Sequence, residues 1–283
     1  MVLPFFQLRQ SAEEAIADVP ALKQVAERVA LHILHGSHGQ KKAGGTEKFW
    51  QFRDYTTNDR PQDIDWRQSA KGDHIFVREK ELHTPQSVYF WANNNESMQF
   101  KSEQAEHSKS EAAQILSLAI ALLLQRGDEY VGVLGRGQAG RSDSAIDRLG
   151  QALLEKDSVL PAGSLSFNSG VVFCSDFLEP FEHIESTFSP FLNATQHGLV
   201  LHVLDPAEIE LPYDGRVVFE DGIESKHVID NVSSIREAYK TQVQMHIDNI
   251  RALCVSHNWQ YHLHVTDCAF ETTLLEIWEG AQR

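Results

Sequence analysis

Three oxygen-bearing side chains stand at alternate positions just after an apolar stretch. They are Asn93, Asn95 and Ser97, within VYFWANNNESM at residues 88–98. A simple chain reversal would account for this segment, because asparagine tolerates turn geometry. The same spacing after a central strand would also let the three oxygens converge on a hard cation, which prefers oxygen ligands. The segment is therefore a candidate cation site as well as a candidate turn.

A second polar turn ends the most apolar run of the chain, GVVFCSD at residues 170–176. In open α/β sheets, ligands bind beyond the carboxyl ends of the strands, where the strand order reverses. If the two strands are neighbours, Asp176 faces the asparagine turn. Ser175 could act as a nucleophile only with a histidine base beside it. Cys174 lies inside the apolar run, where a thiol behaves as a small apolar side chain.

Strand and helix patterns alternate from residue 86 onward. Strands are predicted from apolar runs over residues 88–92, 130–135, 170–176, 199–205 and 259–266. Helices are predicted over residues 112–126, 144–156, 179–195, 234–257 and 269–279. This alternation predicts an α/β fold with a mostly parallel sheet covered by helices on both faces. GRGQAGRS should form a hairpin to a short edge strand, and a turn-rich insertion at about 206–232 should contain one hairpin at Asp214-Gly215.

Ser-x-x-Glu capping boxes predict three helix starts, at Ser11, Ser108 and Ser234. The first helical segment should continue with an apolar face over residues 22–34 and stop at Gly36. The segment that follows is rich in Gly, Asp, Arg and aromatic residues, with short strand-like pieces at FWQFRDY and HIFVREKEL.

The charge is unevenly distributed between two predicted domains, residues 1–84 and 85–283. The first contains 12 Lys/Arg and 12 Asp/Glu, and we expect it to pack on the second. The second therefore has 25 − 12 = 13 Lys/Arg against 40 − 12 = 28 Asp/Glu, which is the whole net charge of −15. We expect no nucleic-acid partner, because a domain this acidic would repel phosphate backbones. A basic protein surface would suit it better.

The composition favours a reduced, cytoplasmic protein. No apolar stretch approaches the roughly 20 residues that span a bilayer. The first residues, MVLPFFQLRQ, lack the pattern of an export signal. Three cysteines in 283 residues do not make a disulfide framework.

The segment at residues 44–81, GGTEKFWQFRDYTTNDRPQDIDWRQSAKGDHIFVREKE, resembles the signature of the bacterial DUF58 family (domain of unknown function 58). The matching residues are Glu47, Arg53, Tyr55, Asp59, Ile64, Asp65, Trp66, Ser69, Ala70 and Lys71, with Arg78 in the same segment. The polar turn at 93–98 and the Ser-Asp-Phe at 175–177 resemble the ligand turns of von Willebrand factor A domains. The resemblance covers nearly the whole chain. It implies a von Willebrand A-like, Rossmann-like three-layer sandwich for residues 85–283.

The resemblance also implies a divalent-cation site from which this chain departs. By position, Asn93 replaces the first aspartate of the relatives, Asn95 the first serine, and Ser97 and Asp176 match the second serine and the far aspartate. A carboxylate about 4 Å from a cation contributes several kcal/mol at an effective dielectric constant of about 20, and the amide of Asn93 loses that contribution. We therefore expect a degenerate metal site without physiological Mg²⁺, with weak binding at most through Ser97 and Asp176.

Proteins that resemble this family are associated with AAA+ ATPases of the MoxR type. We therefore expect a non-enzymatic adaptor that works with such an ATPase in the assembly or maturation of client proteins. One alternative is a cation-dependent domain whose partner completes the metal shell. Another is a metal-assisted hydrolase that uses Asp176 together with the charged cluster at residues 53–78.

That charged cluster has its own structural interpretation. Its arginines and acids surround Trp50, Tyr55 and Trp66, and the pattern favours an ion-pair network over paired catalytic carboxylates. Its exposed part is a candidate docking surface, since aromatic residues and arginine are enriched at interface hot spots. Two groups of histidines suggest no metal site. The first is His32, His35 and His38, which should lie near a helix end. The second is His262 and His264, which should lie on a polar surface.

Overall fold

The computed structural model describes residues 5–17, 43–56, 59–72, 74–81, 85–155, 165, 169–195, 198–220 and 226–280. The chain forms two compact units, one made of Met1–Ser37 with Gln86–Arg283 and the other of His38–Pro85. The predicted helix over residues 22–34 lies outside the described residues, as do His32, His35 and His38.

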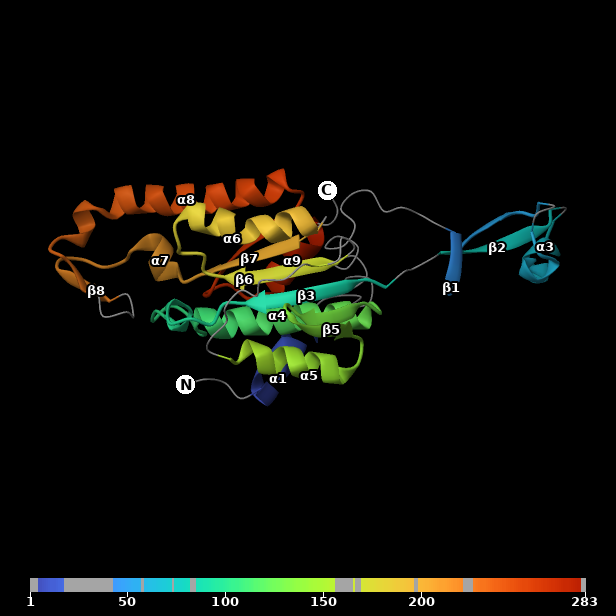
Figure 1. Cartoon of the computed structure of the whole chain (residues 1–283), viewed down its shortest axis with the longest axis horizontal. Helices are drawn as coiled ribbons and strands as arrows, with labels where there is room; N and C mark the ends of the chain where they lie inside the picture. The colour runs from blue at the N-terminus through green and yellow to red at the C-terminus, as the bar shows by residue number, and fades with distance from the viewer. Residues whose placement is uncertain are drawn as a thin grey trace. The chain divides into compact units, whose positions relative to one another are not determined.

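A six-stranded sheet forms the centre of the larger unit (Figure 1). Its order is β10-β7-β6-β3-β4-β5, and only β5 runs antiparallel to its neighbour. The strands are β3 (Ser87–Ala92), β4 (Tyr130–Val133), β5 (Arg136–Gly140), β6 (Gly170–Ser175), β7 (Gly198–Leu204) and β10 (Gln260–Val265). This arrangement confirms the predicted mostly parallel sheet and its antiparallel edge strand.

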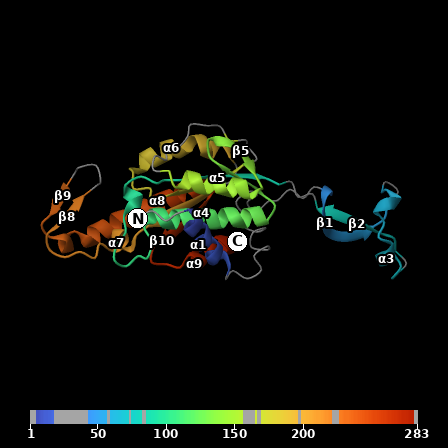
Figure 2. The ribbon, with the colours of Figure 1, turned by 90° about the horizontal axis from the view of Figure 1, so that it is seen from below.

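Helices cover both faces of this sheet, which makes a three-layer α/β sandwich of the Rossmann-like kind (Figures 1 and 2). One face is covered by α4 (Lys109–Arg126), α5 (Asp143–Leu153) and α9 (Phe270–Gly280). The other face is covered by α6 (Phe181–Ala194) and α8 (Arg236–Ser256). A further helix, α1 (Phe5–Ala17), packs on the outer side of α4.

Burial on both faces explains why the central strands are apolar at nearly every position; the buried polar exceptions in β6 and β7 are Ser175 and His202. All residues of β6 and β7 are buried. Along β7, Leu199 and Leu201 belong to the core under α4, whereas Val200 between them belongs to the core under α6 and α8. Side chains alternate between the faces of a strand, so a strand covered on both sides has apolar residues, or polar residues whose hydrogen bonds are satisfied, at each place.

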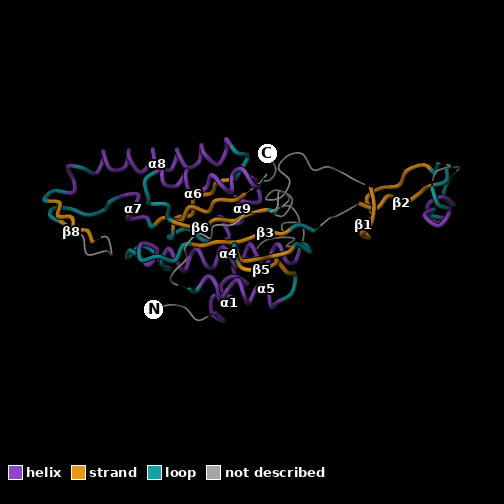
Figure 3. Tube along the Cα trace, viewed as in Figure 1, coloured by secondary structure: helices purple, strands orange, loops and turns teal. Residues whose placement is uncertain are grey.

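The segment after β7 leaves the sheet at its carboxyl end and returns through α8. It contains α7 (Pro206–Glu210), the hairpin of β8 (Val217–Glu220) and β9 (Lys226–Ile229), and a short 3-10 helix, Val232–Ser234 (Figure 3). The predicted insertion and its single hairpin are therefore present. The predicted turn at Asp214-Gly215 is wrong, because both residues precede β8, the first strand of the hairpin with β9.

Two of the three predicted capping boxes are also wrong. Ser108 and Glu111 do cap α4, with both reciprocal hydrogen bonds present, and α4 ends at Gly127 as predicted. Ser11 instead lies inside α1, because the helix already begins at Phe5. Ser234 closes a 3-10 helix, and α8 begins after Ile235 without a side-chain cap.

The smaller unit is a two-stranded antiparallel sheet with short helical turns. It pairs β1 (Ala43–Asp54) with β2 (Phe76–Glu81), and between them lie a 3-10 turn, Pro61–Asp63, and α3 (Trp66–Ser69). The predicted strand-like pieces of this segment are thus both strands. The boundary between Pro85 and Gln86 lies one residue from the predicted boundary between 84 and 85. The larger unit also includes Met1–Ser37, since α1 packs on α4.

Candidate functional site

The two polar turns singled out in the sequence meet at the carboxyl ends of adjacent strands. β3 and β6 are parallel neighbours, with Ala92 opposite Cys174. The amide of Asn93 donates to the carbonyl of Cys174 at 2.8 Å, which continues the ladder one residue past the strand. The expectation that Asp176 faces the asparagine turn is therefore confirmed.

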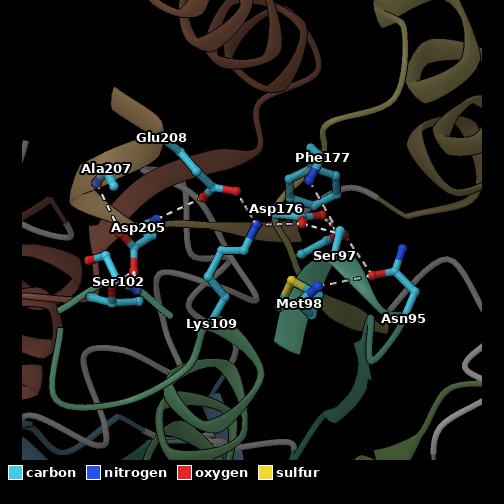
Figure 4. Close-up of polar contacts among 12 residues, drawn as sticks. Asn95, Ser97, Met98, Ser102, Lys109, Asp176, Phe177, Asp205, Ala207 and Glu208 are labelled. Atoms are coloured by element: carbon cyan, nitrogen blue, oxygen red, sulfur yellow. Dashed lines mark hydrogen bonds and ion pairs between the residues drawn. The ribbon is translucent and has the colours of Figure 1, made fainter. Parts of the chain in front are cut away.

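Ser97 joins the two turns directly. Its Oγ lies 2.5 Å from Oδ2 of Asp176 and 2.7 Å from Oδ1 of Asn95 (Figure 4). A hydroxyl has one proton to donate, and a charged acceptor forms the stronger bond, so the proton belongs on the Asp176 side. The donor to Oδ1 of Asn95 is the amide of Met98, at 3.2 Å. This bond orients the Asn95 amide with its oxygen toward the turn.

The side chain of Asn93 hydrogen-bonds to both turns. Its Nδ2 donates to Oγ of Ser175 at 3.1 Å, and its Oδ1 accepts from the amide of Asn95 at 3.1 Å. The side chain is buried, with 7% of its surface exposed. The carbonyl oxygen at this position therefore faces a backbone amide, which is the geometry of a structural turn residue.

Lys109 completes the site, and the sequence reasoning missed it. Its Nζ lies 2.8 Å from Oδ2 of Asp176 and 2.5 Å from Oε1 of Glu208, and the side chain is fully buried (Figure 4). As the first residue of α4, Lys109 places a cation where the helix dipole disfavours one, by up to about 2 kcal/mol for a buried residue. Attraction to one carboxylate at this distance is roughly 6 kcal/mol at an effective dielectric constant of about 20, so the ion pairs dominate.

Glu208 reaches Lys109 from α7, on the segment that follows β7. The same carboxylate accepts from the amide of Asp205 through Oε2 at 2.9 Å, and Asp205 caps α7 by accepting from the amide of Ala207. Burial raises the pKa of Glu208, and the Lys109 ammonium opposes this effect. We call the set Asn93, Asn95, Ser97, Lys109, Asp176 and Glu208 the strand-end site.

The turn after β6 is held in an unusual backbone conformation. Phe177 has φ of +43°, which is uncommon for a residue with a side chain. Nε2 of the buried His202 donates to the carbonyl of Asp176 at 2.8 Å, and its Nδ1 accepts from the Tyr261 hydroxyl at 2.7 Å. Burial lowers the pKa of His202 to about 3, so the imidazole stays neutral and keeps both bonds.

Ser175 does not have the surroundings of a catalytic nucleophile. Within the described part of the chain, its Oγ contacts Asn93, Asp176 and the amide of Phe177, and no histidine hydrogen-bonds to it. Burial raises the pKa of the neighbouring Cys174 thiol well above its usual range, which keeps the sulfur protonated. Across the same residues, no group of three or more His, Cys, Asp or Glu side chains is arranged to hold a metal ion.

The predicted signature residues lie in the smaller unit, and two of them, Arg53 and Asp59, form an ion pair. Arg53 binds Asp59 through both guanidinium nitrogens, each at 2.6 Å, and this contact holds the pKa of Asp59 well below its usual range. Tyr55 donates to the carbonyl of Asp59 at 3.3 Å, and Asp65 caps α3 by accepting from the amide of Gln68. Trp66 is 66% exposed. For two further signature residues, Glu47 in β1 and Arg78 in β2, the structure describes the backbone but not the side chains.

The prediction of a polar surface at the last strand is wrong for His264. This side chain is 1% exposed, and burial lowers its pKa to about 4. His262 and Gln260 are only partly exposed. The prediction fails because α9 covers this end of β10 and packs Phe270 against the His264 ring.

The sequence matches the family described as "Protein of unknown function DUF58" over residues 51–249. The searches of curated proteins and of solved structures found no match. Within the described residues, no helix has both the length and the apolar character needed to cross a membrane.

Proposed function

Because this chain belongs to the DUF58 family, whose function is unknown, we propose that it is a non-enzymatic protein-interaction module. In this proposal it works with an AAA+ ATPase of the MoxR type in the assembly or maturation of other proteins. The partner class comes from the family resemblance set out in the sequence analysis.

The bonding of the strand-end site supports a binding role over a catalytic one. The side-chain oxygens of Asn93 and Asn95 accept from backbone amides, and Asp176 accepts from Ser97 and Lys109. Groups so engaged are fixed in position, which suits recognition by shape and hydrogen bonding. A hydrolase would need an activated nucleophile or metal-bound water at this place.

The exposed part of the turn is the proposed contact with a partner. Asn95, Glu96 and Gln99 are exposed beside the buried ion pairs, and Leu178 on the facing turn is 52% exposed. A rim that combines amides, a carboxylate and an apolar side chain suits a protein surface with basic character. Such a contact would need no bridging cation.

Binding to a purified MoxR-type ATPase tests the proposal, with the full chain immobilised and the ATPase in solution. Asn95→Arg introduces bulk and charge at the exposed turn and should weaken binding at least tenfold. Asn193→Arg makes the same change at an exposed position at the end of α6, beside the start of β7 and so away from the carboxyl ends of the strands, and should leave binding unchanged. The nucleotide-free ATPase should bind equally well in Mg²⁺ and in a chelator.

Three results would contradict the proposal. Absence of binding to the ATPase removes the named partner. Equal binding of Asn95→Arg and Asn193→Arg removes the strand-end site as the contact. Binding that disappears on chelation supports the alternative of a cation-dependent domain.

A further inference from the structure

The strand-end site contains a cation that belongs to the protein. The Nζ of Lys109 is within 2.8 Å of Asp176 and 2.5 Å of Glu208, and 0% of the Lys109 side chain is exposed. The three residues come from the start of α4, the turn after β6 and the helix after β7. A buried ammonium is tolerated only when carboxylates and hydrogen bonds replace its water shell, and here two acids supply them.

The oxygens around this ammonium do not fit a second cation. A divalent ion such as Mg²⁺ needs about six oxygen ligands and prefers charged ones. Oδ2 of Asp176 already accepts from both Lys109 and Ser97. Oδ1 of Asn95 already accepts from the backbone amide of Met98. A metal ion would have to displace these donors and also approach a fixed positive charge.

We infer that the Lys109 ammonium takes the place of a divalent ion at this site. Asp176 and Glu208 are its two anionic ligands, and Ser97 bridges from the first of these to the asparagine turn. The site is therefore assembled by the chain alone, at any concentration of free metal. The ammonium also joins three segments at the sheet edge, as a bound ion would.

The inference has a consequence for variants. Replacing Lys109 by alanine removes the ammonium and leaves the carboxylates of Asp176 and Glu208 facing the same vacated space. Two acids with the Ser97 hydroxyl are a donor set that suits Mn²⁺ or Mg²⁺. Lys109→Ala should thus create a divalent-cation site that the natural chain lacks.

Calorimetric titration with Mn²⁺ and with Mg²⁺ tests this directly. The natural chain should give no saturable binding below millimolar concentration. Lys109→Ala should bind one Mn²⁺ per chain at least tenfold more tightly, and Lys109→Ala/Asp176→Asn should lose that binding. Lys109→Arg, which keeps the positive charge, should behave like the natural chain.

A second measurement does not depend on the stability of any variant. In the natural chain, Mn²⁺ should leave the amide NMR signals of Asn95, Ser97 and Asp176 as sharp as those of the remaining surface. Selective broadening of these signals, or micromolar Mn²⁺ affinity that Asp176→Asn abolishes, would overturn the inference. So would a folded Lys109→Ala chain that gains no Mn²⁺ affinity. These results concern metal alone, so they are independent of whether the proposed ATPase binds.

Discussion

At the scale of single residues, the strand-end site differs from a metal site in where its charges lie. A neutral amide, Asn93, occupies the position where the resemblance implies an acid, and the amide is bonded to Ser175 and to the backbone. The remaining acid, Asp176, is neutralised from within by Lys109. The turn around this acid is further fixed by His202, which donates to the Asp176 carbonyl.

The buried His202 predicts a loss of stability in mild acid. Its pKa is about 3 in the folded chain, whereas a histidine in the unfolded chain titrates near ~6.5. Between these values the unfolded state binds a proton that the folded state does not. The free energy of unfolding should therefore fall as the pH falls below about 6.5, by up to about 1.4 kcal/mol per pH unit for this group.

Urea denaturation between pH 7.5 and 5 measures this slope. His202→Gln keeps an N–H donor for the Asp176 carbonyl but cannot titrate, so its slope should be shallower by the contribution of one histidine. His183→Gln replaces an exposed histidine and should keep the natural slope. The other titrating groups, including Glu208 and His264, contribute equally to the slopes of both variants, so the difference between the two slopes reports on His202. Equal slopes for the two variants would show that His202 is not neutral in the folded chain.

At the scale of elements, α4 holds the strand-end site in register with the sheet. It begins at a capping box formed by Ser108 and Glu111, and Lys109 directly follows the N-cap residue Ser108. Fifteen of its residues are buried, because the sheet covers one side and α1 the other. A defined start for α4 therefore fixes the position of the ammonium relative to β6 and α7.

The cap of α4 should contribute measurably to stability. Ser108 accepts from the amide of Glu111 at 3.2 Å, and Ser108→Ala should lower the free energy of unfolding by about 1 kcal/mol. Ser142 provides the matched control, since it precedes α5 but its side chain makes no capping bond. Ser142→Ala should change stability by less than about 0.5 kcal/mol. Chemical denaturation of both variants checks this, and equal losses would contradict the capping geometry.

At the scale of the whole molecule, α1 completes the core of the larger unit from the far end of the chain. Leu8 and Ala12, one helical turn apart, are both fully buried and belong to the core under α4. Most of the larger unit, by contrast, comes from residues after 85. In the sequence, the smaller unit, His38–Pro85, therefore lies between α1 and the first strand of the six-stranded sheet.

The role of α1 predicts different costs for two neighbouring substitutions. Leu8→Ala should lower the free energy of unfolding by about 2 to 5 kcal/mol, through lost burial and the cavity left behind. Phe6 on the same helix is 76% exposed, so Phe6→Ala should cost less than about 0.5 kcal/mol. Urea denaturation followed by circular dichroism measures both. A loss for Leu8→Ala as small as that for Phe6→Ala would mean that α1 is not part of the core.

Local signals in the sequence determined the order and type of the elements in the larger unit. The apolar runs of β3, β6 and β7, the cap of α4 and its stop at Gly127 could be predicted because each depends on residues close together in the chain. The same signals failed at Ser11 and Ser234, where a Ser-x-x-Glu pattern occurs inside or beside a helix that starts elsewhere. A Ser-x-x-Glu pattern can cap a helix but does not require a helix to start there, and tertiary packing decides where the helix begins.

The sequence by itself also determined that polar turns follow β3 and β6, and the general rule for strand ends placed them together. Only the tertiary structure decided what balances the charge of Asp176. Its partner Lys109 is 67 residues away in the chain, and Glu208 is 99 residues beyond Lys109. The one available hint was a lysine at the first position of a helix, against the dipole. Which acids meet that lysine depends on the order of the strands and the path of α7, and no local pattern encodes either.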